Sequence, residues 1–276
     1  MYAFKDIVKN ALPHGIVTRV IRSQAVRHRR IAALPLCSGA AVKYSYQDSI
    51  EFLCSRGLPR DHVVNGSIPK TSLDFCATHL GSKTLGDKPL IGLHVGNFLG
   101  VSLAYFVDFA RKINPDSMVA SVDPNLTHRG IKNPQEHVVA LLNHFELQHN
   151  AMISVGYSGT KSVSNDGVAF LDDSGDEYDP FTKHASEQSC ENSVRNLSLL
   201  SVGRFDFAVM DGNHDAKYLH IETDTARALL VPGGSLILDD VDDSWVDIKA
   251  EFGKLGESGW SIAGTDGRVG ILTLPR

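Results

Sequence analysis

The sequence predicts an α/β fold: a doubly wound, mostly parallel sheet with an antiparallel last strand. From about residue 89 to residue 255, short apolar runs rich in branched residues alternate with segments of helical spacing, a pattern typical of buried parallel strands joined by helices. Two of the runs close on carboxylates, one at Asp211 and the other at Asp239 and Asp240. The chain then ends in two strand-like segments joined by a Thr-Asp-Gly turn, which indicates an antiparallel edge.

Length and composition exclude several classes of protein. With 276 residues, the chain is long enough for one large domain, or for one domain with an appendage. Its net charge of −5 provides no general attraction to nucleic acid. The 4 cysteines are scattered without a CxxC pair, which fits a reducing compartment and argues against a zinc cluster. No long apolar run opens the chain, so we expect a cytoplasmic protein with no membrane span.

Residues 1–62 show helical spacing and no strand signal, and they predict an N-terminal helical cap that precedes a domain of residues 63–276. Residues 15–34 place several arginines beside an apolar stripe. Such a helix either binds anionic lipid or a partner, or covers a core with its solvated face. Residues 63–68 predict a loop, because Asn and Gly form turns, and a helix follows from residue 70 to residue 80.

The first predicted strand, residues 89–95, leads into a glycine-bracketed turn and then a helix. Gly96 and Gly100 allow the backbone to approach a ligand while the first amides of the helix face it. The GxGxxG pattern of dinucleotide-binding folds is absent, since Phe98 stands where its middle glycine is expected. This disfavours a nicotinamide-dependent dehydrogenase.

The second predicted strand, residues 118–122, ends at Asp123. An acidic residue at this place suits bidentate hydrogen bonding to a ribose diol, although an aspartate before a proline is also an ordinary turn residue. A helix over residues 133–147 and a strand over residues 152–155 come next. Residues 159–192, rich in Ser, Gly and Asp, then predict an insertion, which is either a solvated excursion or a lid over the acceptor.

Residues 205–240 predict a strand, a helix and a second strand, with the helix over residues 217–230. Short right-handed connections place the two strands side by side, about 4.8 Å apart, with Asp211, Asp239 and Asp240 at one edge. Carboxylates crowded in this way resist ionisation unless a cation or hydrogen-bond donors compensate them. A divalent metal is the simplest compensation. The alternative is that these residues only accept backbone hydrogen bonds in their turns.

Over residues 63–276 the sequence resembles the class I S-adenosylmethionine-dependent methyltransferases. More narrowly, it is similar to the metal-dependent O-methyltransferases of the catechol type and to the macrocin-type enzymes that methylate sugar hydroxyls. The motifs are LHVGNFLG, the aspartate that closes the second strand, DGNH, and LLVPGGSLILDD. The resemblance implies a Rossmann-like, seven-stranded methyltransferase sheet. It also implies methyl transfer from S-adenosylmethionine to a hydroxyl of a small molecule or glycan.

The resemblance also implies the residues of the site. Those assigned to the cofactor are Gly66, Ser67, His94, Gly96, Asn97, Gly100, Asp123, Ser158 and Asp211. Those assigned to a magnesium ion, or another divalent cation, are Asp211, Asp239 and Asp240. The metal would lower the pKa of the acceptor hydroxyl. His214, where catechol enzymes have a lysine base, would remove the proton, and Lys217 stands in reserve. Asp211 is assigned to catalysis as well as to the metal.

Two residues depart from the family pattern. His94 stands where an acidic residue is usual, and Phe98 replaces a glycine. The first departure leaves a second function open: a non-catalytic binding protein that keeps the methyltransferase fold and partners another enzyme. Assembly of the chain into a homo-oligomer also stays open.

Overall fold

The computed structural model describes residues 42–83, 88–156, 158, 170–171, 177–178, 205–212 and 216–276. The chain divides into two units, Met1–Ala41 and Val42–Arg276, and every described residue belongs to the second. The predicted basic helix and His214 lie outside the described residues, as does most of the predicted insertion. None of the described helices is both long enough and apolar enough to cross a membrane.

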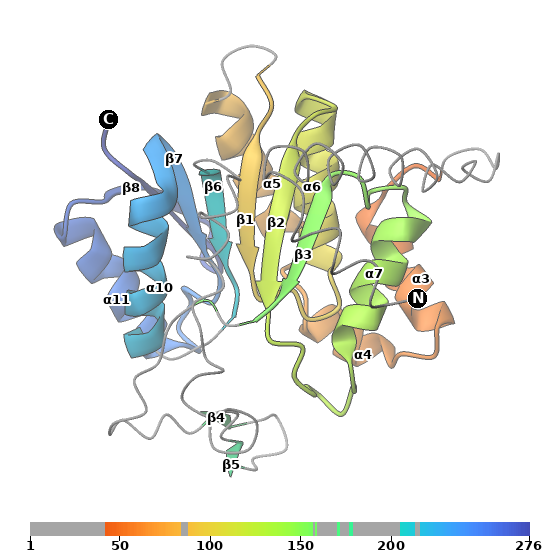
Figure 1. The fold of residues 1–276 in the computed structure, drawn as a ribbon. Coiled ribbons are helices and arrows are strands. Elements are labelled where there is room, and N and C mark those ends of the chain that lie inside the picture. The colour runs from red at the N-terminus through yellow and green to blue at the C-terminus, as the bar shows by residue number, and fades with distance from the viewer. Residues whose placement is uncertain are drawn as a thin grey trace, which may run out of the picture. The chain divides into compact units, whose positions relative to one another are not determined.

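A seven-stranded sheet with the order β3-β2-β1-β6-β7-β9-β8 forms the centre of the molecule (Figure 1). The strands are β1 (Ile91–Val95), β2 (Met118–Asp123), β3 (Ala151–Val155), β6 (Phe205–Met210), β7 (Leu230–Leu238), β8 (Ser261–Thr265) and β9 (Gly270–Thr273). The first five of these pair in parallel. Strand β9 runs antiparallel to both β7 and β8. The predicted fold class is therefore confirmed, including the antiparallel last strand.

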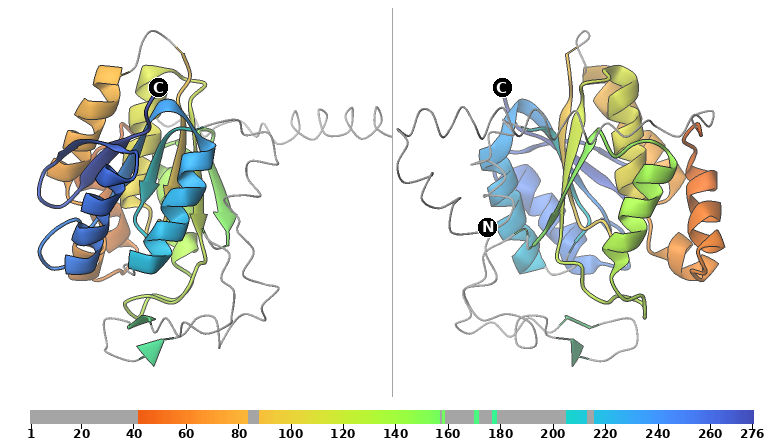
Figure 2. Two further views of the ribbon diagram at one scale, coloured as in Figure 1. Left: turned by 90° about the vertical axis from the view of Figure 1, so that its left-hand side faces the viewer. Right: turned by 45° about the vertical axis from the view of Figure 1, so that its right-hand side comes forward.

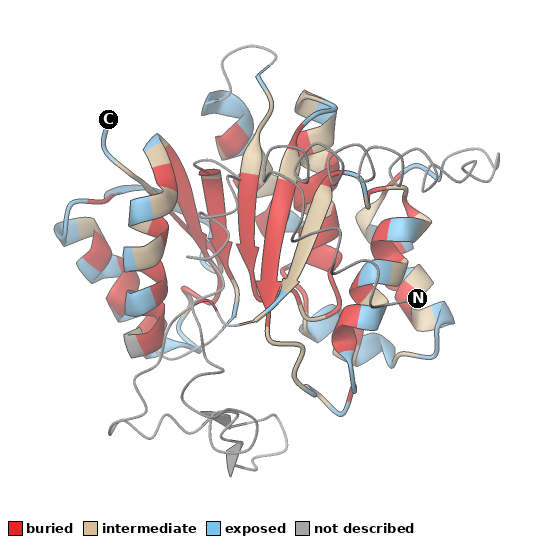
Figure 3. Ribbon diagram, in the orientation of Figure 1, coloured by how far each residue is buried: buried red, intermediate tan, exposed pale blue. Residues whose placement is uncertain are grey.

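Helices cover both faces of this sheet (Figure 2). They are α3 (Tyr46–Ser55), α4 (Arg60–Asn65), α5 (Lys70–Lys83), α6 (Val101–Ile113), α7 (Pro134–His144), α10 (Ala216–Leu229) and α11 (Val246–Glu257). Side chains alternate between the faces of a strand, and β6 follows this rule from Phe207 to Met210. Phe207 and Val209 pack with α3 to α7, whereas Ala208 and Met210 pack with α10 and α11. The central strands are buried on both faces (Figure 3), as their continuous apolar runs predict.

Three local features differ from the sequence predictions. The first three residues of the loop predicted over residues 63–68 belong to helix α4, because Val63 turns into the core, where it is fully buried. Helices α3 and α4, assigned to the cap, contribute to the same core as the sheet. Helix α10 stops at Leu229 as predicted, but the Pro-Gly-Gly sequence lies within β7 and not in a turn. A register irregularity between β6 and β7 accommodates it.

The described part of the predicted insertion contains two short antiparallel strands, β4 (Phe170–Leu171) and β5 (Glu177–Tyr178). The boundary of the cap at residue 62 and the role of the insertion stay predictions.

Candidate active site at the carboxyl edge of the sheet

Strands β1, β2, β6 and β7 end at the same edge of the sheet, the lower edge in Figure 1. Ligands of open α/β sheets bind at this edge. The backbone ladder continues for one residue past the strands: the amides of Gly96, Asp211 and Asp239 donate to carbonyl oxygens of the neighbouring strands at 3.0, 2.9 and 3.1 Å. The backbone of the first residue of each loop is therefore fixed by the same hydrogen bonds as the strands.

The glycine-bracketed turn packs against the residues that follow β6. Gly96 has a φ of +75° and Gly100, which caps α6, has a φ of +84°. A Cβ atom on Gly96 would overlap the carbonyl oxygen of Asp211 and would lie 2.5 Å from the Cα atom of Gly212. Because both neighbours are backbone atoms, only glycine fits at this position.

Asp123 holds this turn in place. Its Oδ2 atom accepts hydrogen bonds from the backbone amides of Asn97 at 2.9 Å and Phe98 at 3.3 Å. Its Oδ1 atom accepts from the amide of Asn125 at 2.7 Å. The side chain of Asp123 therefore acts as a turn residue, which was one of the two roles that the sequence left open. The ribose contact stays a prediction.

The loop after α4 contacts the glycine turn through an aromatic ring. A Cβ atom on Gly66 would lie 2.7 Å from Cδ1 of Phe98, so the ring packs directly on the glycine. Phe98 also packs edge-on against His128, with 4.9 Å between ring centroids. Ser67 is buried and donates to the carbonyl of Val63 at 2.7 Å. The structure thus brings Gly66 and Ser67 to the predicted cofactor loop.

The side chain of Asn97 is buried, and its Nδ2 atom donates to the hydroxyl of Ser121 at 2.8 Å. Its contact with the cofactor stays a prediction. His94 is also fully buried. Its Nε2 atom lies 3.1 Å from the hydroxyl of Ser102 on α6. Burial lowers its pKa from 6.5 to about 3, against a smaller opposing effect of the Gly96 backbone. The lowered pKa favours the neutral form of this buried histidine, and its cofactor role stays a prediction.

A pH-dependent loss of stability follows from the burial of His94. Its folded pKa lies below the unfolded value, so the unfolded chain binds the proton, and stability falls as the pH drops below 6.5 towards 3. Between pH 7.5 and pH 5 we expect a loss of about 2 kcal/mol from this residue. Denaturant unfolding of wild type and His94→Asn should show it, because the variant loses this part of the pH dependence. The exposed residue His149, changed to Asn, is the control, and an equal effect in both variants would contradict the assignment.

Two of the three predicted carboxylates, those of Asp239 and Asp240, contact one arginine. Arg268, in the turn between β8 and β9, donates from Nε to Asp239 Oδ1 at 2.9 Å and from a terminal nitrogen to Asp239 Oδ2 at 2.7 Å. The same nitrogen lies 2.9 Å from Oδ1 of Asp240. Both carboxyl side chains are nearly inaccessible, at 3% and 5%, and that of Arg268 is 34% exposed.

Burial and the mutual charges of this cluster shift the pKa values of its groups. Burial raises the pKa of Asp211 well above its usual value, the charges of Asp239 and Asp240 raise it further, and Arg268 opposes them. Burial also raises the pKa of Asp239 against the opposing hydrogen bond from Arg268. That hydrogen bond is the main cause of the raised pKa of Arg268. Burial and the neighbouring carboxylates thus favour the protonated form of Asp211.

The cluster does not fit the predicted magnesium site. Magnesium requires near-octahedral oxygen ligands at about 2.0–2.1 Å, whereas both oxygens of Asp239 accept hydrogen bonds from Arg268. Among the residues that the structure describes, no group of three His, Cys, Asp or Glu side chains is arranged to hold a metal. The prediction of bound Mg²⁺ at Asp211, Asp239 and Asp240 is therefore not supported, and no chemical step is assigned to a metal.

Two residues of this region, Arg268 and the buried Glu222 of α10, were not predicted from the sequence. The hydroxyl of Ser158 donates to Glu222 Oε1 and lies 3.4 Å from the hydroxyl of Tyr218. Ser158 is thus held by α10, and its predicted contact with adenine stays a prediction. A small pocket beside it is lined by Met210, Asp211, Gly212, Leu219, Glu222, Asp239 and Ile248.

The family model described as "Methyltransferase domain" matches residues 93–241, from β1 to the loop after β7. No curated protein matches the chain in sequence. Among solved structures, the O-methyltransferase from Bacillus cereus in complex with SAH superposes with a TM-score of 0.53 at 12% identity, over 90% of this chain and 97% of that one. The O-methyltransferase TomG from Streptomyces achromogenes, in complex with SAM, gives 0.51 at 13%, over 90% and 95%. CalS11, a TDP-rhamnose 3'-O-methyltransferase of calicheamicin biosynthesis, gives 0.50 at 16%, over 84% and 96%.

Proposed function

Because the chain belongs to the methyltransferase domain family, and its sheet is that of the class I S-adenosylmethionine-dependent enzymes, we propose that it methylates a hydroxyl group of a small molecule or sugar. One observation carries the proposal: Gly96 of the predicted donor loop packs directly on the backbone of Asp211 and Gly212. A sulfonium bound on this loop would lie next to the acidic cluster. Donor and proton acceptor would then share one site.

The proposed reaction is an in-line displacement at the methyl carbon. The acceptor oxygen attacks this carbon, the oxygen–carbon bond forms, and the carbon–sulfur bond breaks with its electron pair going to sulfur. The hydroxyl proton passes to the carboxylate of Asp211, the residue whose backbone packs on Gly96 of the predicted donor loop. His214 stays the proton acceptor predicted from the sequence. The protein contributes chiefly by positioning, which in oriented reactions lowers the barrier by several kcal/mol.

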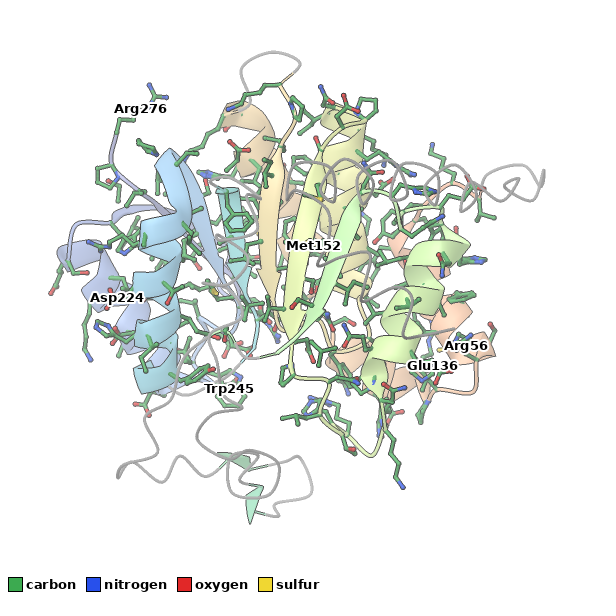
Figure 4. All side chains as sticks on the ribbon, viewed as in Figure 1. Arg56, Glu136, Met152, Asp224, Trp245 and Arg276 are labelled. Atoms are coloured by element: carbon green, nitrogen blue, oxygen red, sulfur yellow. The ribbon has the colours of Figure 1, made fainter. Side chains whose placement is uncertain are left out.

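The loop after β7 supports a hydroxyl-bearing acceptor with an apolar face. Trp245 lies at the carboxyl edge below α10 (Figure 4) and its surface is 39% exposed; Val246 beside it is 68% exposed. An exposed aromatic ring provides a flat apolar surface, and a sugar ring presents a C–H face that can pack on it. CalS11, by its name, methylates a sugar hydroxyl. Sugar acceptors are therefore the first class to test.

The Asp211→Asn variant tests the chemistry. We expect its kcat to fall roughly 100-fold or more, with KM for the cofactor little changed, because the amide keeps the shape of the carboxyl and cannot take up the proton. Transfer of a tritiated methyl group from S-adenosylmethionine to nucleotide sugars and catechols measures this. Asp247→Asn, an exposed aspartate of α11, is the control and should behave as wild type. If Asp211→Asn retains full kcat, the assigned proton acceptor is wrong.

The non-catalytic alternative loses its main support. His94, the departure that suggested it, packs against Ser102 of α6 as part of the interior. Binding of S-adenosylhomocysteine without transfer to any hydroxyl acceptor would revive this alternative.

A further inference from the structure

We propose that the guanidinium of Arg268 takes the place of a divalent cation on the carboxylates of Asp211, Asp239 and Asp240, and that methyl transfer by this chain needs no metal. The statement about turnover rests on the proposed function. The statement about cation binding does not, because it concerns the folded chain alone.

Arg268 makes an extensive contact with the carboxylates that follow β7. Arg268 contacts Asp239 with two donor atoms, one on each carboxyl oxygen, and it reaches Asp240 with one of the same nitrogens. Paired hydrogen bonds of this kind fix geometry as well as charge. A metal bound by Asp239 would have to displace at least one of them. A guanidinium stays charged at any accessible pH, so it would remain as a repelling neighbour of the incoming dication.

The backbone of the sheet also places Arg268 beside these carboxylates. Strands β7 and β9 pair Leu238 with Gly270. Beyond this pair the two segments stay hydrogen-bonded with a shift of one residue at Asp240, whose φ is +59°. The carbonyl of Arg268 accepts from the amide of Val241 at 2.8 Å, which holds the backbone of Arg268 beside the residues that follow β7. The arginine is therefore presented to the acidic cluster by the sheet itself.

The turn that carries Arg268 is also well fixed. The carboxylate of Asp266 accepts from the amides of Arg268 at 2.9 Å and Val269 at 2.7 Å. Gly267, with a φ of +95°, donates to the hydroxyl of Thr265 at 3.1 Å. The turn therefore helps to hold the arginine in place. Asp239 and Asp240 have a permanent counter-ion built into the fold.

The test is a titration of the protein with Mn²⁺ in the absence of any methyl acceptor. Electron paramagnetic resonance measures the concentration of the free ion. Wild type is expected to show no binding at the acidic cluster. Arg268→Met removes the charge and keeps the length, so we expect Mn²⁺ affinity to rise roughly tenfold or more. Adding Asp239→Asn to this variant should abolish the gain. Arg227→Met is the control for loss of an arginine: Arg227 donates to the carbonyl of Ser258 at 2.9 Å and packs on Trp260.

Each outcome decides the proposal. Mn²⁺ binding by wild type that Asp239→Asn removes would overturn it, and so would a folded Arg268→Met variant with no gain in affinity. If Arg268→Met unfolds, the smaller change Arg268→Gln serves for the same measurement, and refolding of either variant by Mn²⁺ supports the proposal. Where turnover is detected, EDTA should leave it unchanged in wild type. A chain without turnover contradicts the proposed function and leaves the Mn²⁺ result to stand on its own.

Discussion

Replacing Gly96 with alanine is expected to abolish binding of S-adenosylhomocysteine and to lower the free energy of unfolding by about 3 kcal/mol or more. The positive φ of +75° is strained for alanine, and the new Cβ would overlap the Asp211 carbonyl and approach the Cα atom of Gly212 to 2.5 Å. Neither neighbour can move without disturbing the ends of β1 and β6. Denaturant unfolding measures the stability, and isothermal titration with S-adenosylhomocysteine measures the binding.

Gly81→Ala is the matched control for this change. Gly81 lies in helix α5, and no atom outside its own helix would come within 4 Å of an added Cβ. Alanine should therefore stabilise the helix by about 0.5–1 kcal/mol and leave cofactor binding intact. Normal binding by Gly96→Ala would mean that the donor loop is elsewhere.

Replacing Asp123 with alanine is expected to weaken S-adenosylhomocysteine binding roughly 100-fold or more. The change removes the acceptor of three backbone amides, those of Asn97, Phe98 and Asn125. An unsatisfied buried donor costs about 1–3 kcal/mol, so the glycine turn would leave the geometry that the proposed site requires. Loss of the predicted ribose contact would add to this effect. Isothermal titration of the folded variant measures the change in Kd.

Asp206→Ala separates this effect from a general loss of stability. Asp206 also accepts a backbone amide, that of Ile91 at 2.8 Å, but at the opposite end of β1. We expect a loss of stability with an unchanged Kd for S-adenosylhomocysteine. Equal weakening of binding by both substitutions would show that Asp123 acts only through the stability of the sheet.

The order of strands and helices was predictable because each strand is a continuous apolar run, buried on both faces. The positions of Asp123, Asp211 and Asp239 followed from the same pattern, since parallel strands carry the residues after them to one edge. Helix α4 was missed because its turn-forming residues, Asn65 and Gly66, lie at its end and after it, and the burial of Val63 that favours the helix depends on tertiary packing.

Arg268 was missed for a different reason. Nothing in its local sequence distinguishes it from a surface residue of a hairpin turn. Its contact with Asp239 and Asp240 depends on the antiparallel register of β7 with β9, which joins segments about 30 residues apart and is set by long-range pairing. A sequence pattern locates three acidic residues at the edge of a sheet, but it does not show which cation compensates them.

The most direct test of the account is an isothermal titration of the wild-type chain with S-adenosylhomocysteine in the presence of EDTA. We expect one molecule to bind saturably, because the proposed cofactor site consists of the glycine turn, Asp123 and the residues after β6 and includes no metal. A folded chain that releases no heat at saturating ligand, or that binds only after a divalent metal is restored, would contradict it.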